Sequence, residues 1–381
     1  MKKISVNELL LSLYLILFPS FSYFFKSQVL NYVFICAIII AFIFNSLLTN
    51  KRNTEKTKIS FTFIKINIIT LSLFAFTFVF YNNDMLIDYL GKYIIYGFLT
   101  MLLFSKVENY DKVIHYSAFL HLILFIISIM DPFNNYKIYQ GYMSFGLFCA
   151  LPCFLLFHIE ENYYKNKKYI IPEIISILLL FYSNRNTILI AIVFVLIFDL
   201  VTKKRSLKKM VKYSLLLIFT SIIIMNAESI LNYISKKFQL NTYAITAILQ
   251  WFHGETTGLA GRDIIWDRAI NVFTSHPIFG IGIGGYHARY GVYCHNLFLD
   301  ILVSTGVLGF ILLLIYLFKS IKIYKCLNNK VFFVFIFVIG FLPLMFNNYF
   351  MAWKYFWIAI YMVLSYEKKV KGEMKKCEMT I

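Results

Sequence analysis

Residues 59–81 read ISFTFIKINIITLSLFAFTFVFY, and this stretch indicates the solvent in which the chain folds. Lys65 is its one charged side chain. About 20 mostly apolar residues are enough for a helix to cross the hydrocarbon core of a bilayer. Similar runs recur along the chain, which is 60% hydrophobic and only 15% charged. Soluble domains carry roughly 25% charged residues, so we predict an all-α integral membrane protein.

Twelve apolar runs are predicted to be transmembrane helices. They are residues 9–25, 29–48, 59–81, 86–104, 113–130, 141–158, 170–183, 187–201, 211–226, 296–318, 331–347 and 351–366. The seventh and eighth are short and are separated by residues 183–186. The first follows two lysines and resembles a secretory signal. No good cleavage site follows it, so we interpret it as an uncleaved first helix.

The distribution of basic residues tests the number of spans. With twelve spans and an internal N-terminus, 26 of the 37 lysines and arginines fall in cytoplasmic segments and nine, Lys354 among them, in external ones. This asymmetry follows the positive-inside rule. A missed helix would invert every later loop, so the pattern favours an even number of spans with both termini in the cytoplasm. The net charge of +18 therefore indicates membrane-flanking clusters, not a nucleic-acid-binding surface.

The predicted spans divide the chain into three parts. Residues 1–226 contain the first nine helices, residues 227–294 form a large external loop, and residues 295–381 contain the last three helices and a basic cytoplasmic tail. Most other connections are much shorter. A long loop among short ones is usually functional or disordered. This one contains Trp251, Trp266 and many aliphatic residues, so we expect it to be ordered and to carry the chemistry.

Within this loop, residues 262–273 are predicted to form a helix that ends at His276 and Pro277. Its apolar residues share one helical face: Ile265, Trp266, Ala269, Ile270 and Phe273. The glycines of residues 280–285 follow and are expected to form a flexible turn. Their similarity to a dinucleotide-binding motif is weak, because no strand precedes them and nucleotides are scarce outside the cell.

His295 and three arginines are the candidates for chemistry. His295 lies where the loop re-enters the membrane, and a histidine near neutral pKa suits general-base work. Arg262 and Arg289 share its loop, and Arg185 lies between two short apolar runs. Arginine binds phosphate oxygens in a bidentate fork, which suggests a lipid-attached pyrophosphate as substrate. The alternatives are a structural His295 and an interfacial Arg185 in a tight hairpin.

Two further patterns have structural interpretations. His276, His287 and His295 match no standard metal-site spacing and no carboxylate cluster accompanies them, so we predict no metal. Asp88 and Lys92 are four residues apart, and we expect them to form a structural ion pair.

The loop and its flanks resemble the O-antigen polymerase and ligase superfamily. The resemblance rests on Gly261-Arg262, Trp266, Ala269, Phe273, His276-Pro277, Gly280, Gly282, Gly284, His295-Asn296, Leu299, Gly306 and Gly309, with Ser183 and Arg185 as a second motif. These motifs cover residues 261–309 and 183–187; elsewhere the similarity is one of topology. It implies metal-independent glycosyl transfer from undecaprenyl pyrophosphate on the periplasmic face of the inner membrane, without a cofactor.

The resemblance also implies roles for individual residues. His295 would activate the acceptor hydroxyl, and Arg262 and Arg185 would neutralise the pyrophosphate leaving group. Arg289 and Asn296 would bind or orient substrate. Trp266, Gly282 and Gly284 are further substrate-binding candidates. The partners implied are the undecaprenyl-pyrophosphate-linked oligosaccharide, a chain-length regulator and a flippase.

The favoured function is an O-antigen polymerase of lipopolysaccharide biosynthesis. Ligases of the superfamily often carry a second histidine just before the motif histidine, where this chain has Tyr293 and Cys294. A ligase that transfers the glycan to lipid A–core is the first alternative. A lipid-linked oligosaccharide flippase is the second, although no internal repeat of the kind common in transporters is evident. A capsule polymerase would have a similar sequence.

Overall fold

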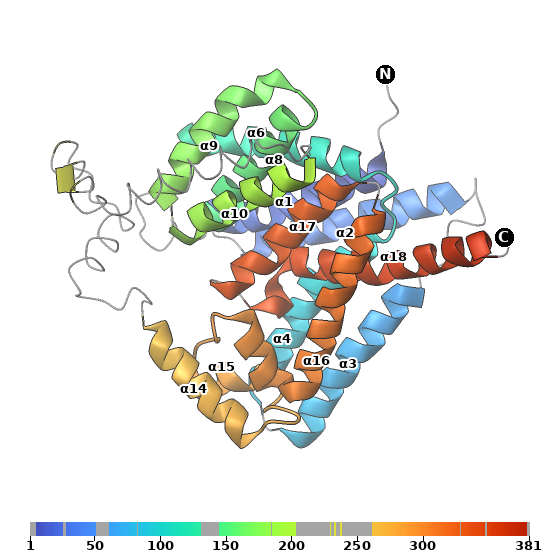
Figure 1. Cartoon of the computed structure of the whole chain (residues 1–381), viewed down its shortest axis with the longest axis vertical. Helices are drawn as coiled ribbons and strands as arrows, with labels where there is room; N and C mark the ends of the chain where they lie inside the picture. Colours follow the sequence, from blue (N-terminus) through green and yellow to red (C-terminus); the bar gives the residue numbers. More distant parts are fainter. Residues whose placement is uncertain are drawn as a thin grey trace.

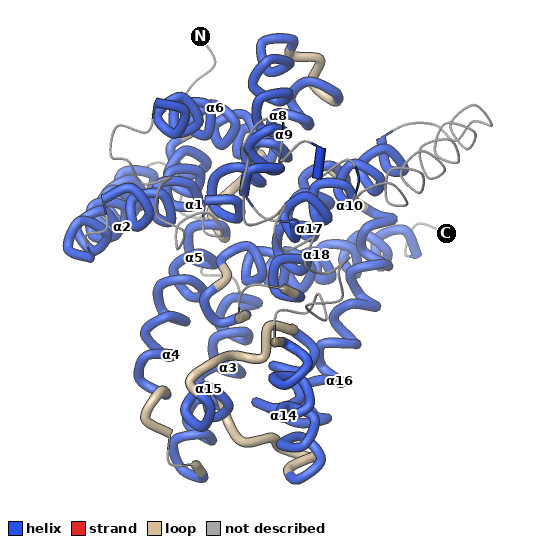
Figure 2. The backbone as a smooth tube through the Cα atoms, turned by 90° about the vertical axis from the view of Figure 1, so that its left-hand side faces the viewer, coloured by secondary structure: helices blue, strands red, loops and turns tan. Residues whose placement is uncertain are grey.

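The computed structural model describes residues 5–25, 28–50, 61–81, 83–130, 145–183, 185–202, 261–327, 329–346 and 349–378, with a few single residues between 229 and 237. Every regular element in these ranges is a helix (Figure 2). The all-α prediction is therefore confirmed for the part of the chain described.

The helices follow the predicted order of apolar runs. They are α1 (Val6–Phe25), α2 (Gln28–Asn50), α3 (Phe61–Phe80), α4 (Leu86–Lys92), the π-helix η2 (Tyr93–Leu99), α5 (Thr100–Phe104), α6 (Tyr110–Met130), the π-helix η4 (Gly146–Ala150), α8 (Leu151–Asn162), the 3-10 turn η5 (Lys167–Tyr169), α9 (Ile170–Ser183), α10 (Arg185–Thr202), α14 (Arg262–Ser275), α15 (Gly285–Tyr290), α16 (Leu297–Cys326), α17 (Lys330–Phe341), the 3-10 turns η6 (Leu342–Met345) and η7 (Phe350–Ala352), and α18 (Lys354–Glu378).

Helices occupy eleven of the twelve predicted spans, and the ninth, residues 211–226, lies outside the described residues. By length and composition, three helices of the described residues are long and apolar enough to cross a membrane. They are Phe61–Phe80, Leu86–Phe104 and Leu297–Tyr324. The shorter apolar helices are Val6–Ile16, Tyr32–Asn45, Asn186–Thr202 and Lys330–Met345. The count of twelve remains a prediction.

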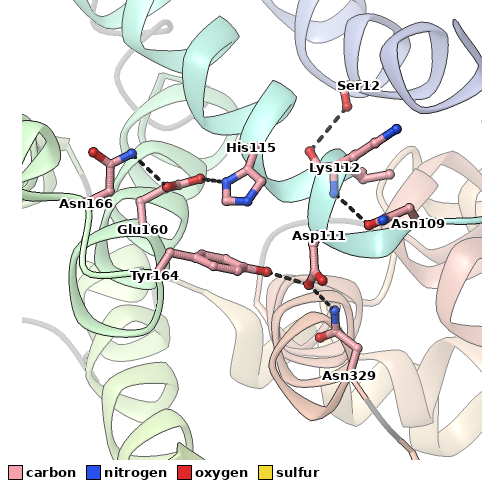
Figure 3. Close-up of polar contacts among 10 residues, drawn as sticks. Ser12, Asn109, Asp111, Lys112, His115, Glu160, Tyr164, Asn166 and Asn329 are labelled. Carbon is pink, nitrogen blue, oxygen red and sulfur yellow. Dashed lines mark hydrogen bonds and ion pairs between the residues drawn. The ribbon is translucent and has the colours of Figure 1, made fainter. Parts of the chain in front are cut away.

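Segments predicted to be cytoplasmic meet at one end of the helices. The Asp111 carboxylate accepts hydrogen bonds from the Tyr164 hydroxyl at 2.6 Å and the Asn329 amide at 2.5 Å (Figure 3). Beside them, His115 Nδ1 lies 2.5 Å from the Glu160 carboxylate. These contacts join the start of α6, the end of α8 and the start of α17, three ends that the charge pattern places on one side.

The N-terminal segment joins the same end. The Glu8 carboxylate, which is buried, accepts hydrogen bonds from the backbone N–H groups of Glu108 and Asn109 at 3.1 and 3.0 Å. The Asn7 amide donates to the carbonyl of Lys106 at 3.2 Å. A fourth predicted cytoplasmic segment therefore lies beside the start of α6.

Segments predicted to be external meet at the other end, where α14 and α15 lie beside the tip of α3 (Figure 1). The Tyr81 hydroxyl, just after α3, donates to the carbonyl of Gly280 at 2.8 Å. The rings of Tyr293 and Tyr349 lie 5.6 Å apart. Where these contacts place described loops, the loops fall into the same two groups as in the charge pattern. Which end faces the cytoplasm remains a prediction.

Lys354 departs from its expected position. The charge pattern assigns it to an external loop, whereas it is 4% exposed at the first residue of α18. Its Nζ donates to the carbonyls of Tyr14 at 2.8 Å and Leu15 at 3.2 Å. Pro19, also in α1, has no N–H, so the Leu15 carbonyl lacks its usual helical donor. A bilayer offers no water in its place, and the Lys354 side-chain nitrogen donates to this carbonyl instead.

Exchanging Lys354 for methionine is expected to lower the free energy of unfolding by about 2 kcal/mol, because two hydrogen bonds to buried carbonyls are lost, each worth about 1 kcal/mol. The loss should be smaller when Pro19 is replaced by alanine, whose N–H returns a donor to Leu15. A double-mutant cycle measured by thermal unfolding in detergent checks this coupling. Strictly additive effects would show that Lys354 does not compensate for Pro19.

Candidate active site at the glycine-turn end

Helix α14 confirms the helix predicted from residue 262. It follows Gly261, whose left-handed backbone (φ 76°) starts the helix, and ends at Ser275, before His276 and Pro277. Its inner face is buried in a small core separate from the main one. That core contains Ala269, Val272, Ile281, Tyr286, Cys294 and Val303. Apolar packing therefore fixes α14 against the start of α16.

The glycine turn is wedged into a break in α16 and is held in place, in contrast to the flexible turn expected. The N–H of Ile281 donates to the carbonyl of Val303 at 2.8 Å. Gly306 interrupts α16 with φ 65° and ψ −162°, a conformation that essentially only glycine adopts. A Cβ at Gly306 would lie 2.2 Å from the carbonyl oxygen of Ile278, and one at Gly280 would lie 2.3 Å from that of Val303. Close backbone approach thus explains both glycines.

Gly282 and Gly284 are buried against α3 and the segment that follows it. Ile283, which lies between the two glycines, makes two hydrogen bonds to this region. Its N–H donates to the Thr77 hydroxyl at 3.1 Å, and its carbonyl accepts from the Asn83 amide at 2.5 Å. A Cβ on Gly282 would lie 2.6 Å from the Thr77 methyl carbon. Both glycines have φ near 80°, at 83° and 78°. The structure thus gives them a packing role; their assignment as substrate-binding residues stays a prediction.

Several contacts position His295 at the entrance to α16. Its backbone has φ 51°, a left-handed conformation that is uncommon for a residue with a side chain. The Trp266 indole N–H donates to the carbonyl of Cys294 at 3.1 Å, which ties the preceding residue to α14. The Asn296 side chain accepts hydrogen bonds from two backbone N–H groups in the first turn of α16, at 3.0 and 3.3 Å. Asn296 is therefore an N-cap, and Trp266 anchors the histidine segment.

The surroundings of His295 favour the neutral imidazole. Burial lowers the pKa of His295, the positive charge of Arg262 lowers it further, and a hydrogen bond to the backbone of Phe346 raises it. Because the pKa of His295 lies below that of an ordinary histidine, the ring is neutral at pH 7, and one ring nitrogen carries a lone pair that can accept a proton. Its Nδ1 is buried without a hydrogen-bond partner among the described residues. Arg262 and His295, paired from the sequence, do lie close enough to interact.

Three tyrosines from different parts of the chain form a row of ring contacts that leads away from His295. We call Tyr89, Tyr293 and Tyr349 the tyrosine cluster. Ring centroids lie 4.1 Å apart for Tyr293 and His295, 5.6 Å for Tyr293 and Tyr349, and 4.7 Å for the stacked Tyr89 and Tyr349. Burial raises the pKa of both Tyr293 and Tyr349, so their hydroxyls stay protonated and can donate hydrogen bonds.

Charged groups border the tyrosine cluster. Lys92 Nζ lies 5.2 Å from the ring centroid of Tyr349 and 2.6 Å from the Asp88 carboxylate, which confirms the predicted ion pair. Asp300, in the first turn of α16, is 7% exposed. After burial, its carboxylate is a cause of the raised pKa of Cys294 and contributes to that of Tyr349.

Asp300 and Tyr349 were not among the residues predicted from the sequence. An acidic residue inside a predicted span is a signal of function that could have identified Asp300. No spacing rule connects Tyr349 to His295, because the two are brought together by the packing of α16, α17 and α4.

The remaining arginines are placed less completely. Arg185 is the first residue of α10, as the motif predicted, but its side chain lies outside the described residues. Helix α10 packs against η6, the turn directly before Phe346. Arg289 is exposed in the last turn of α15. His287, rejected as a metal ligand, has its Nδ1 3.4 Å from the Tyr89 hydroxyl.

In the described residues these features define an all-helical protein with three helices long and apolar enough to cross a membrane. At one end it carries a candidate site of histidine, arginine and tyrosine side chains, built from a loop and the helices it contacts. Residues 173–314 match the family model described as O-antigen ligase. The resemblance to the O-antigen polymerase and ligase superfamily is thereby confirmed, over a range that includes Arg185, Arg262 and His295. No curated protein and no solved structure gives a significant match to this chain.

Proposed function

We propose that this protein is an O-antigen polymerase. It transfers the growing glycan from undecaprenyl pyrophosphate to a lipid-linked repeat unit on the periplasmic face of the inner membrane. The observation that carries the proposal is the proximity of Arg262 to the partly buried His295, at the end of the molecule predicted to be external; burial and Arg262 both lower the pKa of this histidine. A proton acceptor and a fixed cation are what a glycosyl transfer with an anionic leaving group needs.

The reaction uses these groups as follows. The imidazole of His295 accepts the proton of the acceptor hydroxyl as its oxygen forms a bond to the anomeric carbon of the donor sugar. The bond from that carbon to the phosphate oxygen breaks, and undecaprenyl pyrophosphate leaves with the electron pair. Arg262, together with Arg185, stabilises the negative charge that develops on the phosphate. Loss of the proton from His295 to water returns the site to its starting state.

The choice of polymerase over ligase rests on the residues before His295. Neither Tyr293 nor Cys294 is a histidine, so no second imidazole precedes His295. The Tyr293 ring centroid lies 4.1 Å from that of His295, and Cys294 is buried. The flippase alternative is weaker. One asymmetric loop is wedged into α16 beside His295, which suits a fixed catalytic centre better than alternating access.

The surrounding assignments follow from the same proposal. Both termini lie in the cytoplasm, which places the polar contacts of Figure 3 on the cytoplasmic side. The donor and acceptor are both undecaprenyl-pyrophosphate-linked oligosaccharides, and a flippase delivers them. A chain-length regulator is the expected protein partner.

A strain lacking the gene tests the proposal. We expect a gel of its surface polysaccharide to show lipid A–core with a single repeat and no ladder. Bare core, with long chains retained on undecaprenyl pyrophosphate, would instead identify a ligase. Unpolymerised repeats retained on the cytoplasmic leaflet would identify a flippase. Restoring the gene on a plasmid is the control.

A further inference from the structure

The Tyr349 hydroxyl is a buried donor with no visible partner. Tyr349 is 8% exposed, and its oxygen makes no hydrogen bond within the described residues. Leaving such a group unsatisfied is unfavourable, and native structures rarely do so without a reason. The Nδ1 of His295 is in the same situation. Two unsatisfied polar atoms on either side of Tyr293 indicate a place for a ligand with hydroxyl groups.

The tyrosine cluster supplies the apolar part of such a place. Tyr89 and Tyr349 are stacked at 4.7 Å, and Tyr293 links Tyr349 to the His295 ring. Binding sites for small ligands typically combine aromatic walls with a few convergent polar groups. A sugar ring presents C–H groups on its faces and hydroxyls at its edge. Tyrosine rings and hydroxyls match both.

Charge separates this subsite from the pyrophosphate site. The Lys92 ammonium is neutralised by Asp88 at 2.6 Å, and Asp300 is acidic, so these three groups together provide no excess positive charge. These groups therefore offer a pyrophosphate no net electrostatic attraction. The positive charge that acts on His295 comes from Arg262. An uncharged sugar suits the cluster, and the pyrophosphate suits the arginine.

We propose that the tyrosine cluster, with Asp88 and Asp300, binds the terminal sugar ring of the acceptor and presents one of its hydroxyls to His295. In this arrangement the Tyr349 hydroxyl hydrogen-bonds to a second hydroxyl of the same ring. The inference rests on the proposed polymerase function and adds the position of the acceptor to it.

The experiment uses the purified full-length protein in nanodiscs. The donor is the lipid-linked repeat isolated from the native strain. The acceptor probe is the repeat oligosaccharide freed of lipid and phosphate and labelled at its reducing end. For Tyr349→Phe we expect the KM for the labelled oligosaccharide to rise about tenfold, the effect of one lost hydrogen bond, with the KM for the donor unchanged. Phenylalanine keeps the ring, so packing is preserved.

Tyr163→Phe is the matched control, because Tyr163 is exposed and lies at the opposite end, beside Tyr164. It should behave as the wild type. An unchanged acceptor KM in Tyr349→Phe would overturn the subsite, and so would an effect on the donor KM alone. If the wild type extends neither the labelled oligosaccharide nor the lipid-linked repeat, the polymerase function itself fails.

Discussion

Replacing His295 with alanine is expected to stop chain growth, with a loss of two to four orders of magnitude in turnover, the usual contribution of a general base (~10²–10⁴). The physical reason is its neutral, partly buried imidazole, whose Nδ1 has no partner among the described residues. The measurement is the length distribution of surface polysaccharide in a deletion strain complemented with the variant. Immunoblotting should show wild-type amounts of the protein in the membrane.

His276→Ala is the matched control for this variant. His276 also lies in the loop, but its ring faces the carbonyl of Val272 at 3.4 Å and it ends α14. Its removal should leave chain growth near normal. Normal chain lengths in His295→Ala would remove His295 from the mechanism.

Exchanging Arg262 for lysine is expected to reduce turnover about a hundredfold, similar to the loss of one fixed donor to a developing anion. Lysine keeps the positive charge but cannot reproduce the bidentate guanidinium fork. The assay is steady-state polymerisation with the lipid-linked repeat. Arg268→Lys is the control, because Arg268 is exposed and lies 5.7 Å from the ring centroid of Tyr290. Wild-type turnover in Arg262→Lys would argue against bidentate recognition of phosphate.

Substitutions at Arg262 also test whether its positive charge lowers the pKa of His295. Burial and the charge of Arg262 both lower the pKa of His295, so activity should fall only when the pH drops through that lowered value. Arg262→Gln removes the charge, stabilises the imidazolium and should shift the acid limb of the pH–rate profile to higher pH. Arg262→Lys should leave the limb in place. An unshifted limb in the glutamine variant would separate Arg262 from His295.

Much of the architecture could be predicted from local sequence because hydrophobicity and helical periodicity are local properties. The apolar runs predicted helices that the structure contains throughout its described part. The apolar face of Ile265, Trp266, Ala269, Ile270 and Phe273 predicted α14, which begins at Arg262 as expected. One member of that face is wrong: Ile270 is 47% exposed, and Val272 is buried instead. The described loops cluster at two ends, in agreement with the charge pattern. Successive loops alternate between the two sides of a membrane, and basic residues gather in the loops of one side, so this grouping can also be predicted from the sequence.

Other features depend on contacts between segments far apart in the chain. A run of glycines indicates a turn, but only the packing against α3 and the break at Gly306 make that turn rigid. From the sequence, Lys354 is predicted to lie in a loop. Only the contact between the start of α18 and α1 shows that it donates to the Leu15 carbonyl, which Pro19 leaves without a helical donor.

The sequence by itself indicated the membrane solvent, the helices and the choice of His295 and Arg262 as candidates, because these follow from composition, periodicity and the motifs of the family resemblance. Only the tertiary structure decided what surrounds His295. Tyr89, Asp300 and Tyr349 come from α4, α16 and the turn before η7, and burial places them together. Sequence periodicity does not predict this proximity, because it results from packing among helices that are distant in the chain.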